Sequence, residues 1–268
     1  MCAIGSIEDS GVRRPVLQVI DVGLLGYEEA LAEQRRLAAA KKMGDLEQDF
    51  LLLLEHPPVI TLGRGTRANE VFTQPEVIET RAIPCVEIER GGDVTYHGPG
   101  QLVGYPILDL GHYRRDLHWY LRSLERVVIG AIARLGIRGF RVEGYTGVWV
   151  GDVATRPSTA AGAAEEIDPE EAQSLIDRGE IRKIASIGVH ASRWITWHGF
   201  ALNVTDEPLV PFGWIVPCGI DGARMTSLHA EGIGAAQHEV VVELAGSFAA
   251  VFDVPFEWRD YTTRVEGV

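Results

Sequence analysis

Cys218 is the residue of this chain best placed for nucleophilic chemistry. It lies in the run Ile-Val-Pro-Cys-Gly-Ile (residues 215–220), where the flanking Pro217 and Gly219 predict a turn that lifts the side chain out of the packed interior. A thiol becomes a nucleophile when it is accessible and a nearby cation or imidazolium lowers its pKa. The other two cysteines lack this context: Cys2 is next to the N-terminus, and Cys85 precedes a strand-like run that predicts a core or edge position.

Lys183 is the cation whose place in the sequence is most unusual. The chain uses 22 arginines but only three lysines, and Lys41 and Lys42 end a predicted surface helix. Lys183 stands alone in an apolar, strand-like run (residues 182–188), where the pattern predicts burial. Arginine cannot give up its proton, whereas an ammonium group can stabilise a thiolate or pass a proton. The alternative is that arginine-rich usage left a few lysines at arbitrary positions.

Two further segments combine glycines with a histidine. Residues 90–101 read Arg-Gly-Gly-Asp-Val-Thr-Tyr-His-Gly-Pro-Gly-Gln, which matches no phosphate-binding glycine motif. Glycines let main-chain N–H groups approach a carbonyl or carboxylate closely, so Arg90 and His97 bound a candidate binding loop. His198 opens the second segment, although a lone histidine there is more often a structural hydrogen-bonding group than a catalyst. Small residues within 185–188 fit either a substrate tunnel or close strand packing.

The composition is that of an ordinary globular protein. The 268 residues are 46% hydrophobic without a run of 18 apolar residues, and the N-terminus lacks the pattern of a secretory signal. Three cysteines without CxxC spacing argue against a disulfide framework or a zinc site and for a reducing cytoplasm. The net charge of −13 argues against a nucleic-acid partner. An acidic partner protein would need a local basic patch, for which the candidates are Arg64, Arg67, Arg90 and Arg182.

Hydrophobic periodicity predicts strands separated by helices, which is typical of an α/β domain with a substantial sheet. Strands are predicted at residues 16–20, 50–55, 59–62, 85–89, 101–110, 147–150, 184–189 and 199–204, with one more inside the loop 91–100. Helices are predicted at 27–43, ending at Gly44, at about 116–135 and at about 239–252. We therefore expect one domain over residues 14–256.

Residues 151–180 have the character of an insertion. They carry eight acidic residues against two arginines and begin with a polar, alanine-rich linker. A short helix follows, with Asp168 as its cap and Pro169 at its first position. We expect a solvated excursion between two strands, and the alternative is a lid or a partner-docking element.

Together these segments resemble the octanoyl-[acyl-carrier-protein]:protein N-octanoyltransferase family, also called lipoate-protein ligase B or lipoyl/octanoyl transferase. The matching segments follow in family order over roughly residues 16–250: 54–57 (Leu-Glu-His-Pro) with 61–64 (Thr-Leu-Gly-Arg), 90–102, 147–149 (Gly-Val-Trp), 182–189 (Arg-Lys-Ile-Ala-Ser-Ile-Gly-Val), 198–204 (His-Gly-Phe-Ala-Leu-Asn-Val), and 217–220 (Pro-Cys-Gly-Ile) with 226–228 (Thr-Ser-Leu). The acidic segment departs from the family pattern, in which Gly-Val-Trp is closely followed by the Arg-Lys-Ile run.

The resemblance implies a single biotin/lipoate protein ligase-like α/β domain, a mixed β-sheet flanked by helices. It also implies transfer of an octanoyl group from octanoyl-acyl carrier protein to a lysine of lipoyl domains, in 2-oxoacid dehydrogenase subunits and in the glycine-cleavage H protein. No ATP, cofactor or metal is implied, because thioester exchange is nearly balanced and conversion of a thioester to an amide is downhill. We expect a cytoplasmic monomer that binds neither nucleic acid nor a membrane.

The same resemblance assigns roles to individual residues. Cys218 would hold the octanoyl group as a thioester, while Lys183 would lower the pKa of Cys218 and, once neutral, take a proton from the incoming lysine. His97 and His198 would orient the substrate or stabilise the developing oxyanion, and Arg64 and His198 are named as supporting residues of the site. The residues implied to line the acyl and substrate channel are Arg90, Gly91, Gly92, Asp93, Val94, Thr95, Tyr96, His97, Ser186, Ile187, Gly188, Gly199, Phe200 and Ala201. Asp93 occupies a position that the family fills variably and receives no individual role.

Three other functions fit the same scaffold. An ATP-dependent lipoate or biotin ligase would not need Cys218, and a catalytically idle protein that binds lipoyl domains would need neither Cys218 nor Lys183. A thiol hydrolase would release free octanoate. The Pro-Cys-Gly turn favours transfer over ligation, and retention of both Cys218 and Lys183 argues against the idle binding protein. Side hydrolysis stays an open alternative.

Overall fold

The computed structural model describes residues 14–66, 72–151, 166–216 and 222–261. Its elements in chain order are β1 (Leu17–Leu24), α1 (Tyr27–Met43), β2 (Asp49–Glu55), β3 (Val59–Leu62), α2 (Pro75–Thr80), β4 (Cys85–Glu87), β5 (Val94–His97), β6 (Gln101–Ile107), the 3-10 helix η1 (Leu110–His112), α3 (Leu117–Arg134), β7 (Gly139–Val142), β8 (Tyr145–Gly151), β9 (Glu166–Ile167), α4 (Pro169–Asp177), β10 (Ile181–Ser192), β11 (Ile195–Asn203), α5 (Leu209–Phe212), α6 (Gln237–Phe252) and β12 (Phe256–Trp258).

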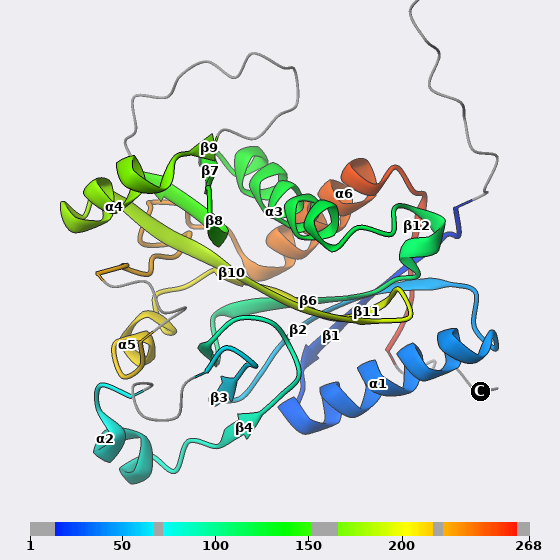
Figure 1. Ribbon diagram of the computed structural model, residues 1–268, viewed down its shortest axis with the longest axis horizontal. Helices are drawn as coiled ribbons and strands as arrows, with labels where there is room; N and C mark the ends of the chain where they lie inside the picture. Colours follow the sequence, from blue (N-terminus) through cyan, green and yellow to red (C-terminus); the bar gives the residue numbers. More distant parts are fainter. Residues whose placement is uncertain (1–13, 67–71, 152–165, 217–221, 262–268) are drawn as a thin grey trace, which may run out of the picture.

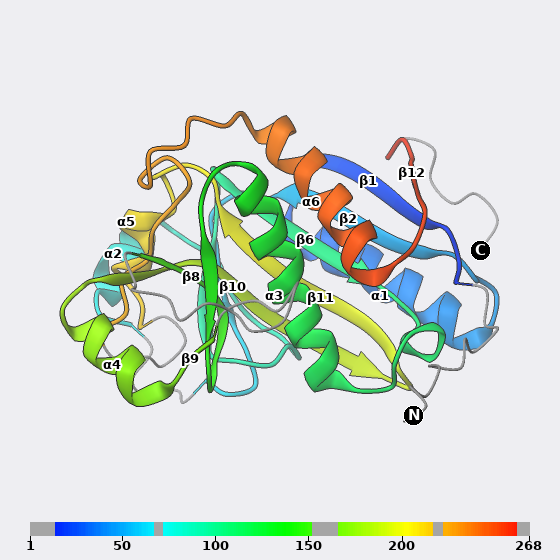
Figure 2. The same cartoon turned by 90° about the horizontal axis from the view of Figure 1, so that it is seen from above.

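A nine-stranded mixed sheet forms the centre of the molecule, in the order β12-β1-β2-β6-β11-β10-β8-β7-β9. β1 pairs in parallel with β2 and β12, whereas the strands from β2 across to β7 pair antiparallel. Helices α3 and α6 cover one face and α1 covers the other (Figures 1 and 2). The predicted fold class, a mixed sheet flanked by helices, is confirmed.

Each face of this sheet has its own apolar core. On the side of α3 and α6, residues such as Leu124 and Phe248 pack against alternate sheet residues such as Leu202. On the side of α1, Leu37 packs against Val103 and other sheet residues that alternate along the strands with those of the first core. Because successive side chains of a strand point to opposite faces, membership of one core or the other tells which way a sheet residue points.

A separate three-stranded sheet, in the order β4-β3-β5, was not expected as a distinct unit. β3 pairs antiparallel with β5 and in parallel with β4, and its core includes Ile60, Tyr96 and Phe212. Figure 1 shows it on the α1 side of the large sheet. This small sheet carries the glycine-rich loop 90–93 and β5 towards that face.

The described part of the acidic segment, residues 166–180, is not a solvated excursion. β9 pairs with β7, and α4 buries Ala172, Leu175 and Ile176 in a cluster that includes Trp149. The predicted cap is confirmed, since the Asp168 carboxylate accepts hydrogen bonds from the amides of the first turn. The apolar stripe of α4 is what ties this segment to the sheet.

Lys41 also differs from expectation. Its side chain is 1% exposed, and its ammonium group lies 2.8 Å from Asp49 Oδ1 and donates to the carbonyl oxygens of Glu47 and Gln48. The last turn of α1 is therefore anchored in the interior, and only Lys42 fits the predicted surface position. No helix within the described ranges is long and apolar enough to span a bilayer.

Candidate active site

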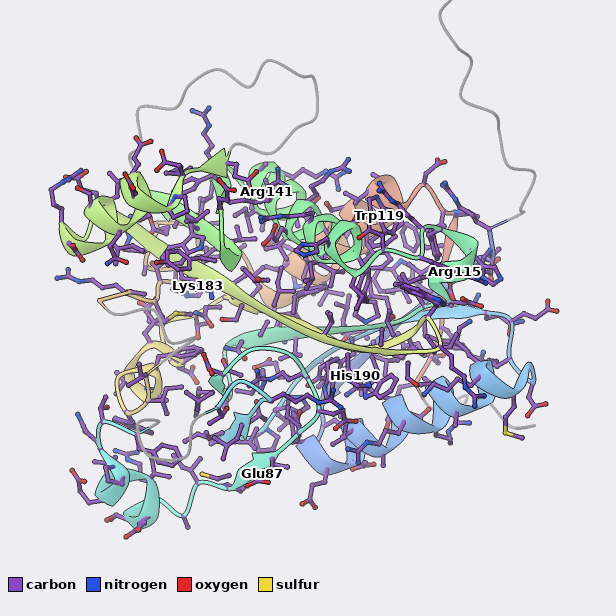
Figure 3. All side chains as sticks on the ribbon, viewed as in Figure 1. Glu87, Arg115, Trp119, Arg141, Lys183 and His190 are labelled. Carbon is purple, nitrogen blue, oxygen red and sulfur yellow. The ribbon has the colours of Figure 1, made fainter. Side chains whose placement is uncertain are left out.

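Lys183 is turned to the α1 side of the sheet by a bulge in β10. Ile184 and Ala185 both pack in the core under α3 and α6, which two successive residues of a regular strand cannot do. The register with β8 shifts between Lys183 and Ala185, and this irregularity sends the Lys183 side chain to the opposite face. Figure 3 labels Lys183 on β10. The predicted burial is confirmed, because the residue is 1% exposed.

Trp149 and Gly147 form the immediate surroundings of Lys183. Trp149 is the partner of Lys183 on β8, and the ammonium nitrogen lies 5.7 Å from the centre of its ring. A Cβ atom at Gly147 would lie 2.5 Å from Lys183 Cε, so only glycine leaves room for the lysine. The amide of Gly147 donates to Oε1 of the buried Glu125. Burial raises the pKa of Glu125, against the opposing hydrogen bonds from Arg122 and Gly147.

His198 is also turned out of its regular place in β11. Its partner on β10, Val189, packs towards α3 and α6, so a regular strand would point His198 the same way. Instead the backbone of His198 has φ 57°, a left-handed conformation that costs a non-glycine residue roughly 1–2 kcal/mol. Its ring lies 6.5 Å from that of Tyr105, on the α1 side. Local strain thus moves a histidine to the same side as Lys183.

A cavity opens on this side between the large sheet, the glycine-rich loop and the first turn of α1. It encloses about 480 Å³ of empty space, including its mouth. The lining residues come from α1, the 90–97 segment, β6, β10 and β11: Tyr27, Arg90, Gly92, Asp93, Val94, Thr95, His97, Val103, Tyr105, Ser186, Ile187, Gly188, His198, Gly199, Phe200 and Ala201. Three segments far apart in the sequence, all singled out for their glycines or histidines, therefore share one cavity.

Some residues of the predicted site lie elsewhere. Tyr96 points into the core of the small sheet against Phe212, because it alternates with Thr95 and His97 on β5. Gly91, Arg64 and Lys183 are not among the lining residues. Tyr27, Val103 and Tyr105 line the cavity and were missed. No sequence signal marked them, because each belongs to an otherwise ordinary helix or strand.

The histidines around the cavity are neutral. Burial lowers the pKa of His97 and of His198 to about 3, and that of His56 to about 4. His56 Nδ1 bonds to the carbonyl oxygen of Leu25, so its Nε2 accepts the Tyr105 hydroxyl proton at 2.8 Å. Uncharged imidazoles act here as directional hydrogen-bonding groups and supply no imidazolium to a thiol.

The predicted basic patch is not present as a group of free arginines. Arg90 is buried and donates to the carbonyl and hydroxyl oxygens of Thr61. Arg182 forms a bidentate ion pair with the carboxylate of Glu231. Of the other two candidates, Arg64 is exposed, and Arg67 lies outside the described residues. Arg90 instead links the glycine-rich loop to β3 through its hydrogen bonds to Thr61.

Cys218 lies outside the described residues, so the proposed nucleophile has no described side chain. The described residues that follow it are bonded to Lys183: the amide of Lys183 donates to the Arg224 carbonyl oxygen, and the amide of Thr226 donates to that of Lys183. Cys85 lies exposed on β4, which is an edge strand of the small sheet. Within the described ranges, no group of three or more His, Cys, Asp or Glu side chains is arranged to hold a metal ion.

Comparison with solved structures places the fold among lipoate protein ligases. A bi-partite lipoate protein ligase from Thermoplasma acidophilum superposes with a TM-score of 0.63 at 14% identity, over 93% of this chain and 88% of that one. A lipoate-protein ligase A bound with ATP gives a TM-score of 0.60 at 14% identity, over 94% and 90%. At this identity the likeness concerns the fold alone.

Sequence comparison gives closer relatives. The octanoyltransferase of Gloeobacter violaceus is 44% identical over 239 residues, which are 89% of this chain and 91% of that protein. The octanoyltransferase of Geobacter sulfurreducens is 44% identical over 88% of this chain and 83% of that protein. The family described as the lipoyl protein ligase A/B catalytic domain matches residues 26–249. This chain therefore belongs to the lipoyl protein ligase A/B catalytic domain family.

Proposed function

We propose that this protein is an acyltransferase that moves an octanoyl group from octanoyl-acyl carrier protein to a lysine of lipoyl domains, through a thioester on Cys218. The shared name of relatives 40–44% identical over most of the chain supports octanoyl transfer. The observation of the structure that carries the proposal is Lys183, a buried ammonium group turned by a bulge to the side of the sheet that holds the cavity.

The cavity suits an acyl chain with a polar reacting end. Val103, Ala201 and the Tyr105 ring, all of the core on the α1 side, offer apolar surface. His97, Ser186 and His198 supply polar groups. Burial of methylene groups supplies about 0.8 kcal/mol each, so an apolar wall can hold a medium-length chain without a charged anchor. Ser186 Oγ and His198 Nε2 are buried without a hydrogen-bond partner among the described residues. A bound thioester would offer them an acceptor.

In the first step, the Cys218 thiolate attacks the carbonyl carbon of the donor thioester. The bond from that carbon to the carrier sulfur breaks, and the carrier leaves as a thiol that has received the proton from Lys183. Lys183 is then neutral. This step exchanges one thioester for another and requires no ATP.

In the second step, the amino group of the acceptor lysine attacks the acyl carbon. The bond from that carbon to Cys218 Sγ breaks, the amide forms, and the surplus proton of the amine passes to Lys183. The enzyme is then a thiolate and an ammonium group again. Arginine could not serve in this cycle, because it does not deprotonate.

The test is the intact mass of the purified protein after incubation with octanoyl-acyl carrier protein in the absence of ATP. We expect one octanoyl group, located on Cys218 by peptide mapping and lost to apo lipoyl domain when that domain is added. Cys218→Ala should form no adduct, whereas Cys85→Ala, at the exposed cysteine of β4, should form it normally. Modification only when free octanoate and ATP are supplied would identify a ligase, and steady release of octanoate without acceptor would identify a hydrolase.

The acceptor class follows from the same reasoning and has its own readout. We expect octanoylation of lipoyl domains from 2-oxoacid dehydrogenase subunits and of glycine-cleavage H protein. A lipoyl domain with its target lysine replaced by arginine is the matched control, since it keeps the charge and removes the nucleophile. An acyl-enzyme that forms but transfers to none of these proteins would contradict the acceptor assignment and leave the first step standing.

A further inference from the structure

A chain of buried hydrogen bonds leads from the cavity wall to the backbone next to Lys183. His97 Nδ1 lies 2.7 Å from Gln101 Oε1, and Gln101 Nε2 donates to Asn203 Oδ1 at 2.9 Å. Asn203 Nδ2 then donates to the carbonyl oxygen of Thr226 at 2.9 Å. The side-chain members are at most 7% exposed, so water competes little with these bonds.

The last acceptor fixes the direction of every bond in this chain. A backbone carbonyl can only accept, so Asn203 must present its NH₂ group to Thr226 and its oxygen to Gln101. Gln101 must then present its NH₂ group to Asn203 and its oxygen to His97. His97 therefore carries its proton on Nδ1.

The consequence is that Nε2 of His97 is an acceptor. The ring lines the cavity, and among the described residues Gln101 is its only hydrogen-bond partner. His56 makes an instructive contrast, because its Nε2 is already occupied by the Tyr105 hydroxyl. Of these two neighbouring imidazoles, whose centres lie 5.7 Å apart, only His97 has an acceptor nitrogen left for a bound molecule.

We propose that Gln101 and Asn203 are positioning residues that hold His97 as a hydrogen-bond acceptor, and that His97 Nε2 accepts an N–H of the attacking lysine amine. The identity of the donor group rests on the proposed function: an octanoyl thioester presents only acceptors, whereas the amine carries N–H groups. His97 does not donate to the oxyanion, contrary to the role that the resemblance implied for it. That task falls to other donors of the cavity.

The electrostatics around His97 favour this assignment. The charged and titratable groups facing its ring are Tyr27 of α1, His56, Arg90 of the glycine-rich loop and His198 of β11. Burial is the largest cause that keeps the pKa of His97 at about 3, and His56 and Arg90 add to it. So weak a base orients an amine without retaining its proton, which leaves proton transfer to Lys183.

The tautomer can be measured without any activity. In protein labelled with ¹⁵N-histidine, the His97 signals, assigned by their loss in His97→Asn, should show a protonated Nδ1 and an unprotonated Nε2. They should not titrate between about pH 5 and 8, because the pKa lies far below that range. A proton on Nε2, or a midpoint near the ordinary histidine value, would overturn the proposal.

The variant Gln101→Glu separates the acceptor role from an oxyanion role. The introduced carboxylate still accepts the Nδ1 proton, although it replaces the donor to Asn203 Oδ1 by an acceptor. Its negative charge favours the imidazolium and raises the pKa of His97, which places a proton on Nε2. Transfer from isolated acyl-enzyme to apo lipoyl domain should then fall about 10- to 100-fold at low pH and recover as the pH rises above the new midpoint. An oxyanion donor would give the opposite result, faster transfer at low pH.

Two controls keep the outcomes distinct. The exposed Gln48→Glu adds the same charge away from the cavity and should transfer like the wild type. If the wild type forms no acyl-enzyme, the proposed function fails, while the ¹⁵N measurement still decides the tautomer. If Gln101→Glu does not fold, the wild-type spectrum remains the deciding test.

Discussion

The ammonium nitrogen of Lys183 lies 5.7 Å from the centre of the Trp149 ring, and the two residues are direct partners across β10 and β8. A desolvated ammonium group over an indole gains about 2 kcal/mol from the ring quadrupole. Trp149 is itself fully buried and packs against α4 of the acidic segment. The position of the proposed acid–base residue therefore depends on a cluster to which that segment contributes.

Replacing Lys183 by arginine tests whether it transfers a proton. Lys183→Arg keeps the positive charge but cannot become neutral, so we expect transfer to the lipoyl domain to fall about 100-fold or more. The measurement is the rate of each half-reaction from isolated components. The matched control is Lys42→Arg, at a residue of α1 whose ammonium group lies over the ring of Trp197. This variant should retain full activity. Full activity in Lys183→Arg would reduce the lysine to an electrostatic role.

Gly147 provides a second test, because only glycine at this position leaves room for the Lys183 side chain. An added methyl would lie 2.5 Å from Lys183 Cε and 2.6 Å from the Ala185 carbonyl oxygen, at a φ of 131° that disfavours any side chain. We expect Gly147→Ala to lower the free energy of unfolding by about 2–4 kcal/mol and to slow both half-reactions. Gly144→Ala, at φ 77° with no atom within 4 Å, should cost only about 1 kcal/mol. Equal losses in the two variants, measured by urea unfolding, would contradict the steric argument.

Much of the fold could be predicted from the sequence, because α1, α3 and the strands of the large sheet have clear apolar periods. α1 begins at Tyr27 and ends at Met43, as predicted, because the left-handed Gly44 caps it. The edge strands β9 and β12 and the neighbouring β7 were missed, since each is too short to show a period. The packing of α4 was also missed, because its acidic composition masks a three-residue apolar stripe.

Part of the candidate site could also be predicted from the sequence, and part could not. Glycines and histidines marked the loop 90–97 and the segments at Ser186 and His198, all of which meet at the cavity. The direction of Lys183 could not be predicted, because it depends on a bulge at Ile184 that no residue type signals. The tautomer of His97 could not be predicted either, because it is set by a chain of hydrogen bonds that ends on the carbonyl oxygen of Thr226.

The buried histidines predict how stability depends on pH. Burial holds the pKa of His56 at about 4 and that of His97 and His198 at about 3, against 6.5 in the unfolded chain. Below about pH 6.5 the unfolded chain binds protons that the folded chain does not, so each histidine lowers the free energy of unfolding by up to about 1.4 kcal/mol per pH unit. This contribution is complete above pH 6.5 and is lost as the pH falls to about 4 for His56 and to about 3 for His97 and His198.

Urea unfolding between about pH 5 and 7.5 avoids the titration of carboxylates with ordinary pKa values. Burial raises the pKa of Asp49 and of Glu125, so the effect of a histidine is taken as the difference between the wild type and a histidine variant. His56→Gln should flatten the slope by one histidine, whereas Gln48→Ala, at an exposed position without a titratable side chain, should leave it unchanged. A free energy of unfolding that does not change across this interval in the wild type would mean that these rings bind protons equally in the folded and unfolded chains, so that burial does not lower their pKa.

The acidic segment predicts a stability effect of its own. Ile176 is 2% exposed in the cluster around Trp149, so Ile176→Ala should lower the free energy of unfolding by about 2–4 kcal/mol. Glu171→Ala, on the exposed side of α4, should change it by less than about 0.5 kcal/mol. If both variants change the free energy of unfolding by less than about 0.5 kcal/mol, α4 does not pack on the sheet in solution. The segment would then be the solvated excursion that the sequence predicts.

His198 tests whether its strained backbone serves the cavity. Asparagine tolerates the left-handed conformation, whereas a β-branched residue at φ 57° is strongly disfavoured, so His198→Asn should be more stable than His198→Val by about 1–2 kcal/mol. Both variants lose the imidazole that lines the cavity, and we expect both to slow octanoyl transfer. Activity that follows stability across the two variants would mean that the ring acts only through folding. Similar activity losses despite unequal stability would show that the strain is kept because it holds this imidazole on the side of Lys183.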